Sequence, residues 1–371
     1  MAVRMTQYRV FAPIRIEGLM TALGQRCRNA LCALVVVACG AGTPALAAET
    51  YQADPALVAA AAKEGEVVWY STLIVNQLVR PLIAAFNQQF PQIKVSFVRG
   101  DSPQVLLWML NETSAHRVQS DVWNLASGFD KLRAAGAAGP LDLPNAKALP
   151  PECLDPNGYW VATDMTVHTL AYNTTMVTGE DVPRSSADLL DPKWRGKMAW
   201  KVGDMTGSTG FVGQVLYAMG EDRGMEYLRA LAKQQVVPVL SSVRAMLDQV
   251  IAGEYPIGLQ ASNHHVAISA GQGAPVNWVP FDLSSATLQL TGITANAPHP
   301  NAARLFLDFT ISRAGEAVYR DAGYLPSRSD TPALVPNLKP GPGSYQAHIF
   351  QPQEIDANYT RWSKIYDDVF K

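Results

Sequence analysis

Two runs of polar residues have the types and the spacing to bind a small anion. The first, residues 207–211, places Ser208, Thr209 and Gly210 directly before an apolar stretch with helical periodicity. The first amides of a helix have no intrahelical acceptor and lie at the positive end of its dipole. We expect amides and hydroxyls there to hold an anion, with Gly210 allowing close approach. The alternative is an ordinary Ser/Thr helix cap.

The second run is Asn263, His264 and His265. A neutral or protonated histidine can donate a hydrogen bond to a carboxylate or a phosphonate. Adjacent side chains of a strand point to opposite faces, so both rings can reach one ligand only from a loop or from the start of a helix. The alternative is that one imidazole packs in the interior while the other faces solvent.

Polar residues also follow apolar segments that read as strands. Ser71 and Thr72 come after one such segment, and Asn124 ends another. Ligands of parallel α/β sheets bind beyond the carboxyl ends of the strands, so these three side chains are candidate ligand contacts. A turn or a helix cap at Ser71 and Thr72, and a strand cap at Asn124, are the alternatives.

The predicted elements alternate along the chain, which is typical of an α/β protein with a parallel sheet. A helix opens at Asp54-Pro55, and Trp69, Trp108 and Trp123 are expected in the core rather than in an aromatic ligand cage. Extended segments are predicted at residues 66–70, 93–98, 121–124, 159–162, 167–172 and 256–259. Further helices are predicted at residues 209–220, 222–233, 242–252, 302–312, 314–322 and 355–370.

Composition excludes several classes of function. A net charge of −2, from 30 basic and 32 acidic residues, is too balanced for nucleic-acid binding through phosphate contacts. With 48% apolar and 17% charged residues, the chain is globular, and 371 residues suggest two domains or lobes. It has no P-loop, no G-x-S-x-G elbow and no histidine in a metal-binding pattern. We therefore expect ligand capture, with no catalytic site, no metal and no cofactor.

The first 47 residues have the pattern of a secretory signal peptide. Five arginines precede the apolar run at residues 30–38, and an Ala-x-Ala site follows it. We therefore expect a periplasmic protein, in which Cys153 is the one remaining cysteine and no internal disulfide forms. Because five basic residues and one acidic residue leave with the leader, the net charge becomes −6. The alternatives are a buried N-terminal helix, a start at Met20, and lipid anchoring at Cys39.

Four stretches, taken together and in order, resemble one family. They are residues 189–197 (LLDPKWRGK), 252–258 (AGEYPIG), 273–276 (GAPV) and 297–303 (APHPNAA). This set resembles the bacterial periplasmic solute-binding proteins of ABC importers, in particular the ferric-iron-binding-protein-like branch. The resemblance covers nearly the whole chain after the leader.

The resemblance implies a fold and partners. The fold would be α/β, a two-lobed type II periplasmic binding protein with two hinge-crossing strands, near residues 160–167 and 288–291. The first lobe would comprise residues 48–166 and 290–337, and the second lobe residues 167–289 and 338–371. The protein would be a monomer that delivers its solute to an inner-membrane permease and its ATPase, without enzyme activity and without nucleic acid.

The resemblance also permits a test for iron. Ferric-binding members use a histidine after the first strand, a glutamate after the third and a tyrosine pair in the second lobe. The matching positions lie near Leu73, near Ala126 and at His264-His265, and none carries the family's ligand. Ferric ion favours anionic oxygen ligands, which neutral imidazoles do not supply.

A second feature of the family concerns anions. Ferric-binding members hold an accessory anion at the helix start that corresponds to residues 207–211. We therefore expect the solute to be a small organic anion, such as a phosphonate, an organophosphate, a carboxylate or a sulfonate. Ferric iron is the alternative, and a secreted enzyme or sensor subunit on the same fold is a third hypothesis.

Overall fold

The computed structural model describes residues 50–341 and 343–371. The predicted signal peptide at residues 1–47, including Cys39, lies outside these ranges. Residues 48–371 form one compact unit. Among the described helices, none is both long enough and apolar enough to cross a membrane.

A twelve-stranded sheet organises the described residues, with a main path in the order β2-β1-β3-β10-β5-β8-β6-β7. The strands on this path are β1 (Glu66–Ser71), β2 (Lys94–Arg99), β3 (Val122–Leu125), β5 (Val161–Asn173), β6 (Met198–Lys201), β7 (Val237–Val239), β8 (Ile257–Ser262) and β10 (Ser285–Thr294). Four short strands pair beside it: β4 (Ala138–Gly139), β9 (Val276–Val279), β11 (Leu325–Pro326) and β12 (His348–Phe350).

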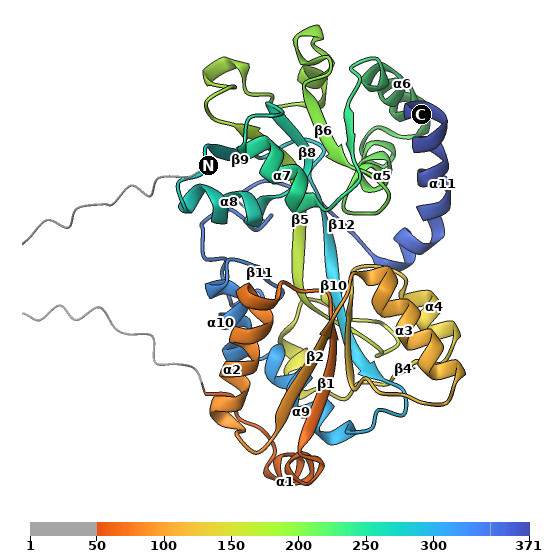
Figure 1. Cartoon of the computed structure of the whole chain (residues 1–371), viewed down its shortest axis with the longest axis vertical. Helices are drawn as coiled ribbons and strands as arrows, with labels where there is room; N and C mark the ends of the chain where they lie inside the picture. Colours follow the sequence, from red (N-terminus) through yellow and green to blue (C-terminus); the bar gives the residue numbers. More distant parts are fainter. Residues whose placement is uncertain (1–49, 342) are drawn as a thin grey trace, which may run out of the picture. The chain divides into compact units, whose positions relative to one another are not determined.

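The sheet is mixed, with parallel pairing where strands and helices alternate and antiparallel pairing at the two longest strands. β1 is parallel to β2 and β3, and β6 is parallel to β7 and β8, as the alternation of strands and helices predicts. However, β10 is antiparallel to β3 and to β5, and β5 is antiparallel to β8. The reason is that β5 and β10 run in opposite directions between two groups of elements, as Figure 1 shows.

These two long strands are the predicted crossing strands. Their register pairs His168 with Ser285 at one end and Val161 with Thr291 at the other, with an irregularity between Gln289 and Leu290. Both predicted crossings, near residues 160–167 and 288–291, fall within them. A bulge of this kind bends a strand locally and increases its twist.

Helices cover both groups of strands. They are α1 (Pro55–Glu64), α2 (Arg80–Gln89), α3 (Ser102–Ser114), α4 (Phe129–Ala134), α5 (Ser208–Met219), α6 (Glu221–Ala232), α7 (Val243–Ile251), α8 (Asn263–Gly271), α9 (Pro300–Thr310), α10 (Arg313–Asp321) and α11 (Pro352–Phe370). A π-helical turn, Val75–Val79, leads into α2, and short 3-10 turns are Pro144–Ala148, Pro151–Cys153, Gly179–Asp181, Ser186–Leu190 and Pro192–Trp194.

Local sequence explains where several helices begin. The Asp54 carboxylate accepts from the Ala56 amide at 2.9 Å, and Pro55 opens α1, as predicted. Asp101 and Gln104 form a reciprocal capping box at the start of α3. By contrast, neither α5 nor α8 has a side-chain cap, so the first amides of both helices are left for other partners.

The first core cluster packs around β1 and β3. Trp69 lies edge-on to Phe306 at 5.4 Å between ring centroids, and Trp123 stacks on Phe129. Both tryptophans are buried, which confirms the prediction of a core position for them. Trp108 is half-buried and packs against the same cluster. The cluster draws its members from residues 51–167 and from residues 286–338.

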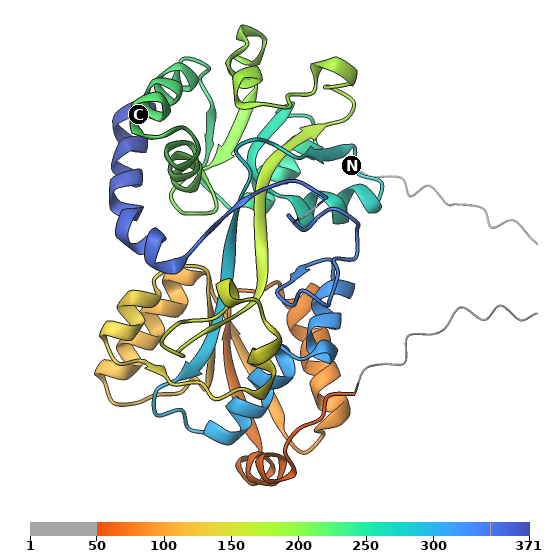
Figure 2. The ribbon, with the colours of Figure 1, turned by 180° about the vertical axis from the view of Figure 1, so that it is seen from behind.

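A second core cluster packs around β6, α5 and α11. Trp200 contacts the rings of Phe211 and Tyr366, and the Trp362 ring lies directly against Gly213, where a Cβ atom would approach it to 2.9 Å. Figure 2 shows the chain after β11 crossing over β5 and β10 to reach α11. Residues 170–283 and residues 350–366 therefore share this cluster.

Candidate functional site

The start of α5 lacks the side-chain cap that was the alternative to anion binding. Gly207 is the N-cap residue, and the Phe211 amide donates to its carbonyl at 3.0 Å. The amides of Ser208, Thr209 and Gly210 thus precede the helical ladder. Both hydroxyl side chains are buried: Thr209 Oγ1 lies 3.5 Å from Ser363 Oγ of α11, and the Ser208 hydroxyl lies beside the Tyr366 hydroxyl of the same helix.

The glycines of this segment have a packing reason of their own. A Cβ atom at Gly210 would lie 2.0 Å from the Met205 carbonyl oxygen, and one at Gly207 would lie 2.2 Å from the Lys201 carbonyl oxygen. No side chain fits at either place without moving backbone. Gly210 therefore permits the tight loop between β6 and α5, which is a different role from the close ligand approach that we expected.

His264 and His265 lie in the first turn of α8, as their joint reach for one ligand requires. Their ring centroids are 4.2 Å apart, and His264 is 1% exposed. The Nδ1 and Nε2 atoms of both rings are buried and have no hydrogen-bond partner among the described residues. The alternative of one packed and one solvated ring therefore does not describe this pair.

An irregularity in β8, the strand before α8, sets the orientation of the first turn of α8. Gln260 of β8 has φ +59, an uncommon value for a non-glycine residue, and its side chain is buried. The pairing of β8 with β5 shifts register between Thr169 and Ala171. Such irregularities re-aim the residues that follow, and here the residues that follow are Ser262 and the histidines.

Tyr324 and Asn263 connect α8 to the other group of elements. The Tyr324 ring, a member of the first core cluster, lies 5.0 Å from the His264 ring and 6.3 Å from the His265 ring. Asn263 Nδ2 donates to the Leu338 carbonyl at 2.7 Å and to Tyr345 Oη at 3.0 Å. The start of α8 thus lies where the two groups of elements meet, and Asn263 is committed to contacts within the chain.

A third histidine, His168 of β5, joins this cluster. Its Cα atom pairs in register with Ser262, the residue just before α8. Its Nε2 atom lies 3.0 Å from Thr287 Oγ1 of β10, whereas its Nδ1 atom has no partner among the described residues. Sequence reasoning missed His168 because no local motif surrounds it; its position within the predicted extended segment 167–172 was the only signal.

Burial keeps all three imidazoles neutral. It lowers the pKa of His168 and of His265 to about 4, and it lowers the pKa of His264 well below its usual value. The Lys201 charge further lowers the pKa of His168, which places that ammonium group within electrostatic reach of the cluster.

Lys201 ends β6, shortly before the start of α5. Its side chain is 15% exposed and forms an ion pair with Asp204. Burial lowers its pKa, while Asp101 at the start of α3 acts in the opposite direction. Sequence reasoning missed this lysine as well, although its place between a strand and the Ser208-Thr209 helix start was visible in the sequence.

Ser71, Thr72 and Asn124 come together at the ends of β1 and β3, but their hydrogen bonds are made within the chain. The Ser71 hydroxyl accepts from the Leu73 amide at 3.2 Å, which is a local turn. Asn124 Oδ1 accepts from the Thr72 hydroxyl, and Asn124 Nδ2 lies 3.0 Å from Thr291 Oγ1 of β10. These contacts tie β1 and β3 to a crossing strand.

The sequence matches the family model for bacterial extracellular solute-binding proteins over residues 126–342, which is more than half of the chain. The chain belongs to this family. Members act in transport as the solute-binding component of ABC importers, and they are not a family of enzymes.

Solved structures of solute-binding proteins share this fold. Iron-bound HitA from Pseudomonas aeruginosa gives a TM-score of 0.69 at 21% identity, over 82% of this chain and 99% of that chain. IdiA (FutA) from Trichodesmium, in complex with iron and citrate, gives 0.67 at 17% identity, over 82% and 99%. AfuA from Actinobacillus pleuropneumoniae, with exogenous fructose-6-phosphate bound, gives 0.63 at 22% identity, over 82% and 98%. These structural similarities show the two-lobed type II fold with its crossing strands. Because the sequence identities are low, they do not identify the ligand of this chain.

The solute-binding protein has no ready-made metal site among its described side chains. No group of three or more His, Cys, Asp or Glu residues is placed to share an ion in residues 50–341 and 343–371. The His264 and His265 rings lie 4.2 Å apart between centroids, but neutral imidazoles supply no anionic oxygen ligand. Their chemistry suits hydrogen bonding to an anion better than coordination of a hard cation.

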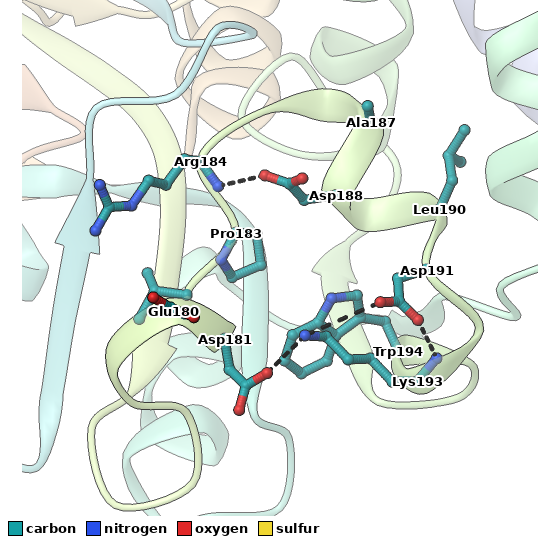
Figure 3. Close-up of a pocket in the computed structure, with 11 residues that line it drawn as sticks. Glu180, Asp181, Pro183, Arg184, Ala187, Asp188, Leu190, Asp191, Lys193 and Trp194 are labelled. Carbon is teal, nitrogen blue, oxygen red and sulfur yellow. Dashed lines mark hydrogen bonds and ion pairs between the residues drawn. The ribbon is translucent and has the colours of Figure 1, made fainter.

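A separate surface cavity lies within the loops between β5 and β6 of the solute-binding protein (Figure 3). It has a volume of about 540 Å³ and is lined by residues from Glu180 to Trp194. Lys193 Nζ lies 2.7 Å from Asp181 Oδ1, and Asp188 accepts from the Arg184 amide. Lys193 is thus paired with an acidic residue of the lining, and none of the predicted site residues lines the cavity.

Proposed function

We propose that this protein captures a small organic anion (a phosphonate, an organophosphate, a carboxylate or a sulfonate) for an ABC importer. The carrying observation is the pair His264 and His265, whose ring nitrogens are buried at an uncapped helix start and have no partner within residues 50–341 and 343–371. A buried polar group without a partner costs about 1–3 kcal/mol. A ligand that accepts hydrogen bonds from these rings removes that cost, which favours binding.

Three further features support an anion over a neutral solute. The first amides of α5 and of α8 have no side-chain cap, and the positive end of each helix dipole lies there. The Lys201 ammonium group, which is paired with Asp204, acts electrostatically on His168. The net charge of −6 that remains without the leader gives no general attraction for anions, so binding depends on these local donors.

The two core clusters support the division into lobes. The first lobe would comprise residues 48–166 and 290–337, and the second lobe residues 167–289 and 338–371. Capture would proceed by closure of the lobes through bending of β5 and β10, followed by presentation of the closed form to the inner-membrane permease and its ATPase. We further propose that the protein is a periplasmic monomer, released from its leader at residue 47.

Native mass spectrometry of the purified protein tests the proposal most directly. Release of an organic anion of defined mass supports it. A thermal-shift screen with phosphonates, sugar phosphates, dicarboxylates and sulfonates is the complement, because a ligand that binds only the native state raises Tm by mass action. Stabilisation by neutral sugars or peptides alone would contradict the proposal.

Ferric iron is the second candidate, because HitA and IdiA (FutA) share the fold and were solved with iron. Elemental analysis of protein purified without chelator decides between the two. Stoichiometric iron would favour the ferric candidate, whereas an iron-free protein with a bound organic anion would favour ours.

A further inference from the structure

We infer that the site binds its anion together with a proton, which the cluster of His168, His264 and His265 accepts, so that affinity rises as the pH falls. The inference rests on the proposed function, because it concerns the regulation of the same site. It adds that a histidine takes up a proton when the anion binds, in addition to serving as a hydrogen-bond donor.

The geometry of the cluster is the first support. His264 and His265 lie with their centroids 4.2 Å apart, and His168 pairs with Ser262 immediately before them. Five of the six ring nitrogens have no partner among the described residues; the exception, His168 Nε2, contacts Thr287. A nitrogen without a partner can accept a proton as soon as an anion arrives to stabilise the resulting charge.

Among the described residues around the cluster, the Asp248 carboxylate of α7 acts on a ring and raises the pKa of His265, against the larger effect of burial. From α7, Arg244 and Asp248 act on His265, but they form an ion pair with each other at 2.8 Å. From β6, Lys201 acts on His168. β8 and β9, which pack on α8, contribute no titratable side chain.

Tyr324 and Tyr345, which follow β10 in the chain, and Asp164 of β5 add two uncharged phenols and one buried acid. Tyr324 packs on the His264 ring, and Tyr345 reaches Asn263 beside it. Burial raises the pKa of Tyr324, with the Asp164 carboxyl of β5 as a further cause, so the phenol stays neutral. Burial also raises the pKa of Asp164 to about 8, so this carboxyl is largely protonated at neutral pH.

The proton balance of the binding step follows. In the free protein, burial holds the pKa of His168 and of His265 at about 4, so both rings are neutral at pH 7. An anion beside the rings favours the imidazolium form and raises these pKa values. One proton then moves from solvent to a ring nitrogen, which donates it in a hydrogen bond to the anion. No covalent bond forms or breaks. Because the complex binds more protons than the free protein, the complex is favoured as the pH falls.

Calorimetry with matched esters tests the inference. The full chain, with chelator present, is titrated with inorganic phosphate, glucose 6-phosphate and glucose 6-sulfate at pH 7.5 in two buffers of different ionisation enthalpy. The sulfate ester is the decisive probe because it cannot take up a proton near neutral pH, whereas a phosphate ester can. We expect an uptake of about 0.5–1 proton per bound sulfate ester and a Kd that falls about 3- to 10-fold per pH unit between pH 8 and pH 6.

Variants assign the proton to the cluster. His168→Gln and His265→Gln keep a hydrogen-bonding side chain but cannot be protonated, so we expect binding at pH 8 with a weakened pH dependence. His116→Asn, at an exposed histidine far from the cluster in sequence, is the matched control and should behave as the wild type. If the variants do not fold, histidine NMR of the wild type provides the same test, because an imidazolium signal should appear when the sulfate ester is added.

The outcomes separate this inference from the proposed function. Binding of a probe without proton uptake and without pH dependence would overturn the inference and leave the proposed function in place. Failure of every anion in the calorimetric series and the thermal-shift screen to bind would overturn both.

Discussion

The end of β1 and the start of α8 are both rich in buried polar groups, yet their hydrogen bonding differs. At β1, Thr72 and Asn124 bond to each other, and Asn124 continues to Thr291 of β10. At α8, no ring nitrogen of His264 or His265 has a partner in the part of the chain that the structure describes. A polar group that is paired within the chain stabilises the fold, whereas one without a partner is available to a ligand. We therefore assign a structural role to the first region and propose the second as the place for binding.

Lowering the pH should reduce the stability of the protein through the buried histidines near α8, and not through the uncharged side chains at the end of β1. The pKa of His168 and of His265 is about 4 in the folded protein and about 6.5 in the unfolded chain, so the unfolded state binds more protons between these values. Stability should therefore fall as the pH decreases from 7 to 4, by up to about 3 kcal/mol per histidine. Urea unfolding across this range measures it. His265→Gln should reduce the dependence; an unchanged pH profile in that variant would contradict the assignment.

Asn124→Ala should destabilise the protein without a comparable effect on binding. The variant removes contacts to Thr72 and Thr291 and leaves buried partners unsatisfied, at a cost of about 3 kcal/mol. We expect the affinity for the natural solute to change less than 3-fold, a bound that reflects the absence of a lost ligand contact. Denaturant unfolding and calorimetry provide the two readouts. A large loss of affinity at unchanged stability would show instead that Asn124 contacts the ligand.

His264→Leu should show the opposite pattern. Replacement of a buried ring that lacks partners by an apolar side chain removes no internal hydrogen bond, so Tm should stay the same or rise. Affinity for the solute should fall about 100-fold, or about 2.7 kcal/mol. His116→Asn serves as the matched control. Wild-type affinity in the leucine variant would remove His264 from the site.

Gly210→Ala should disturb the start of α5 through the backbone. The added Cβ would lie 2.0 Å from the Met205 carbonyl oxygen, so the loop must move, at a cost of about 2 kcal/mol. Gly271→Ala is the control, because a Cβ there meets nothing within 4 Å. Thermal unfolding of both variants measures the difference. Equal Tm values would show that the loop adjusts freely.

Lys193→Ala should have the smallest effect. Its ion pairs with Asp181 and Asp191 lie at the surface cavity, where solvent weakens them. We expect no measurable change in Tm or in solute affinity. A loss of affinity would bring the cavity of Figure 3 into the binding function.

The sequence predicted most of the elements, whereas its site residues stay a prediction. Helical and strand periodicity located nearly all the long elements. The adjacency of His264 and His265 allowed a shared ligand only from a loop or from the start of a helix, and the pair lies at the start of α8. The family resemblance predicted that two strands cross, but the antiparallel course of β5 and β10 was not predicted, because periodicity shows that a strand exists and says nothing about its direction.

The rest of the site depends on contacts between distant residues. Tyr324 lies 60 positions after His264, and His168 reaches α8 only through the pairing of β5 with β8. No local pattern marks either of them. The side chains of Ser208 and Thr209 are likewise buried rather than open, since α11 returns to cover that part of the molecule.

The discontinuity of the first core cluster has a consequence for the order of folding during synthesis. Trp69 packs against Phe306, and α1 packs along α9. The packing partners of these early residues are therefore synthesised more than 230 positions later. Until the ribosome has passed α9, the faces of β1 and α1 have no permanent cover. High contact order of this kind slows folding and prolongs the exposure of apolar surface. The apolar surface of the nascent chain thus needs protection from aggregation until α9 has been made. This requirement suits a polypeptide that is held unfolded until its synthesis is complete.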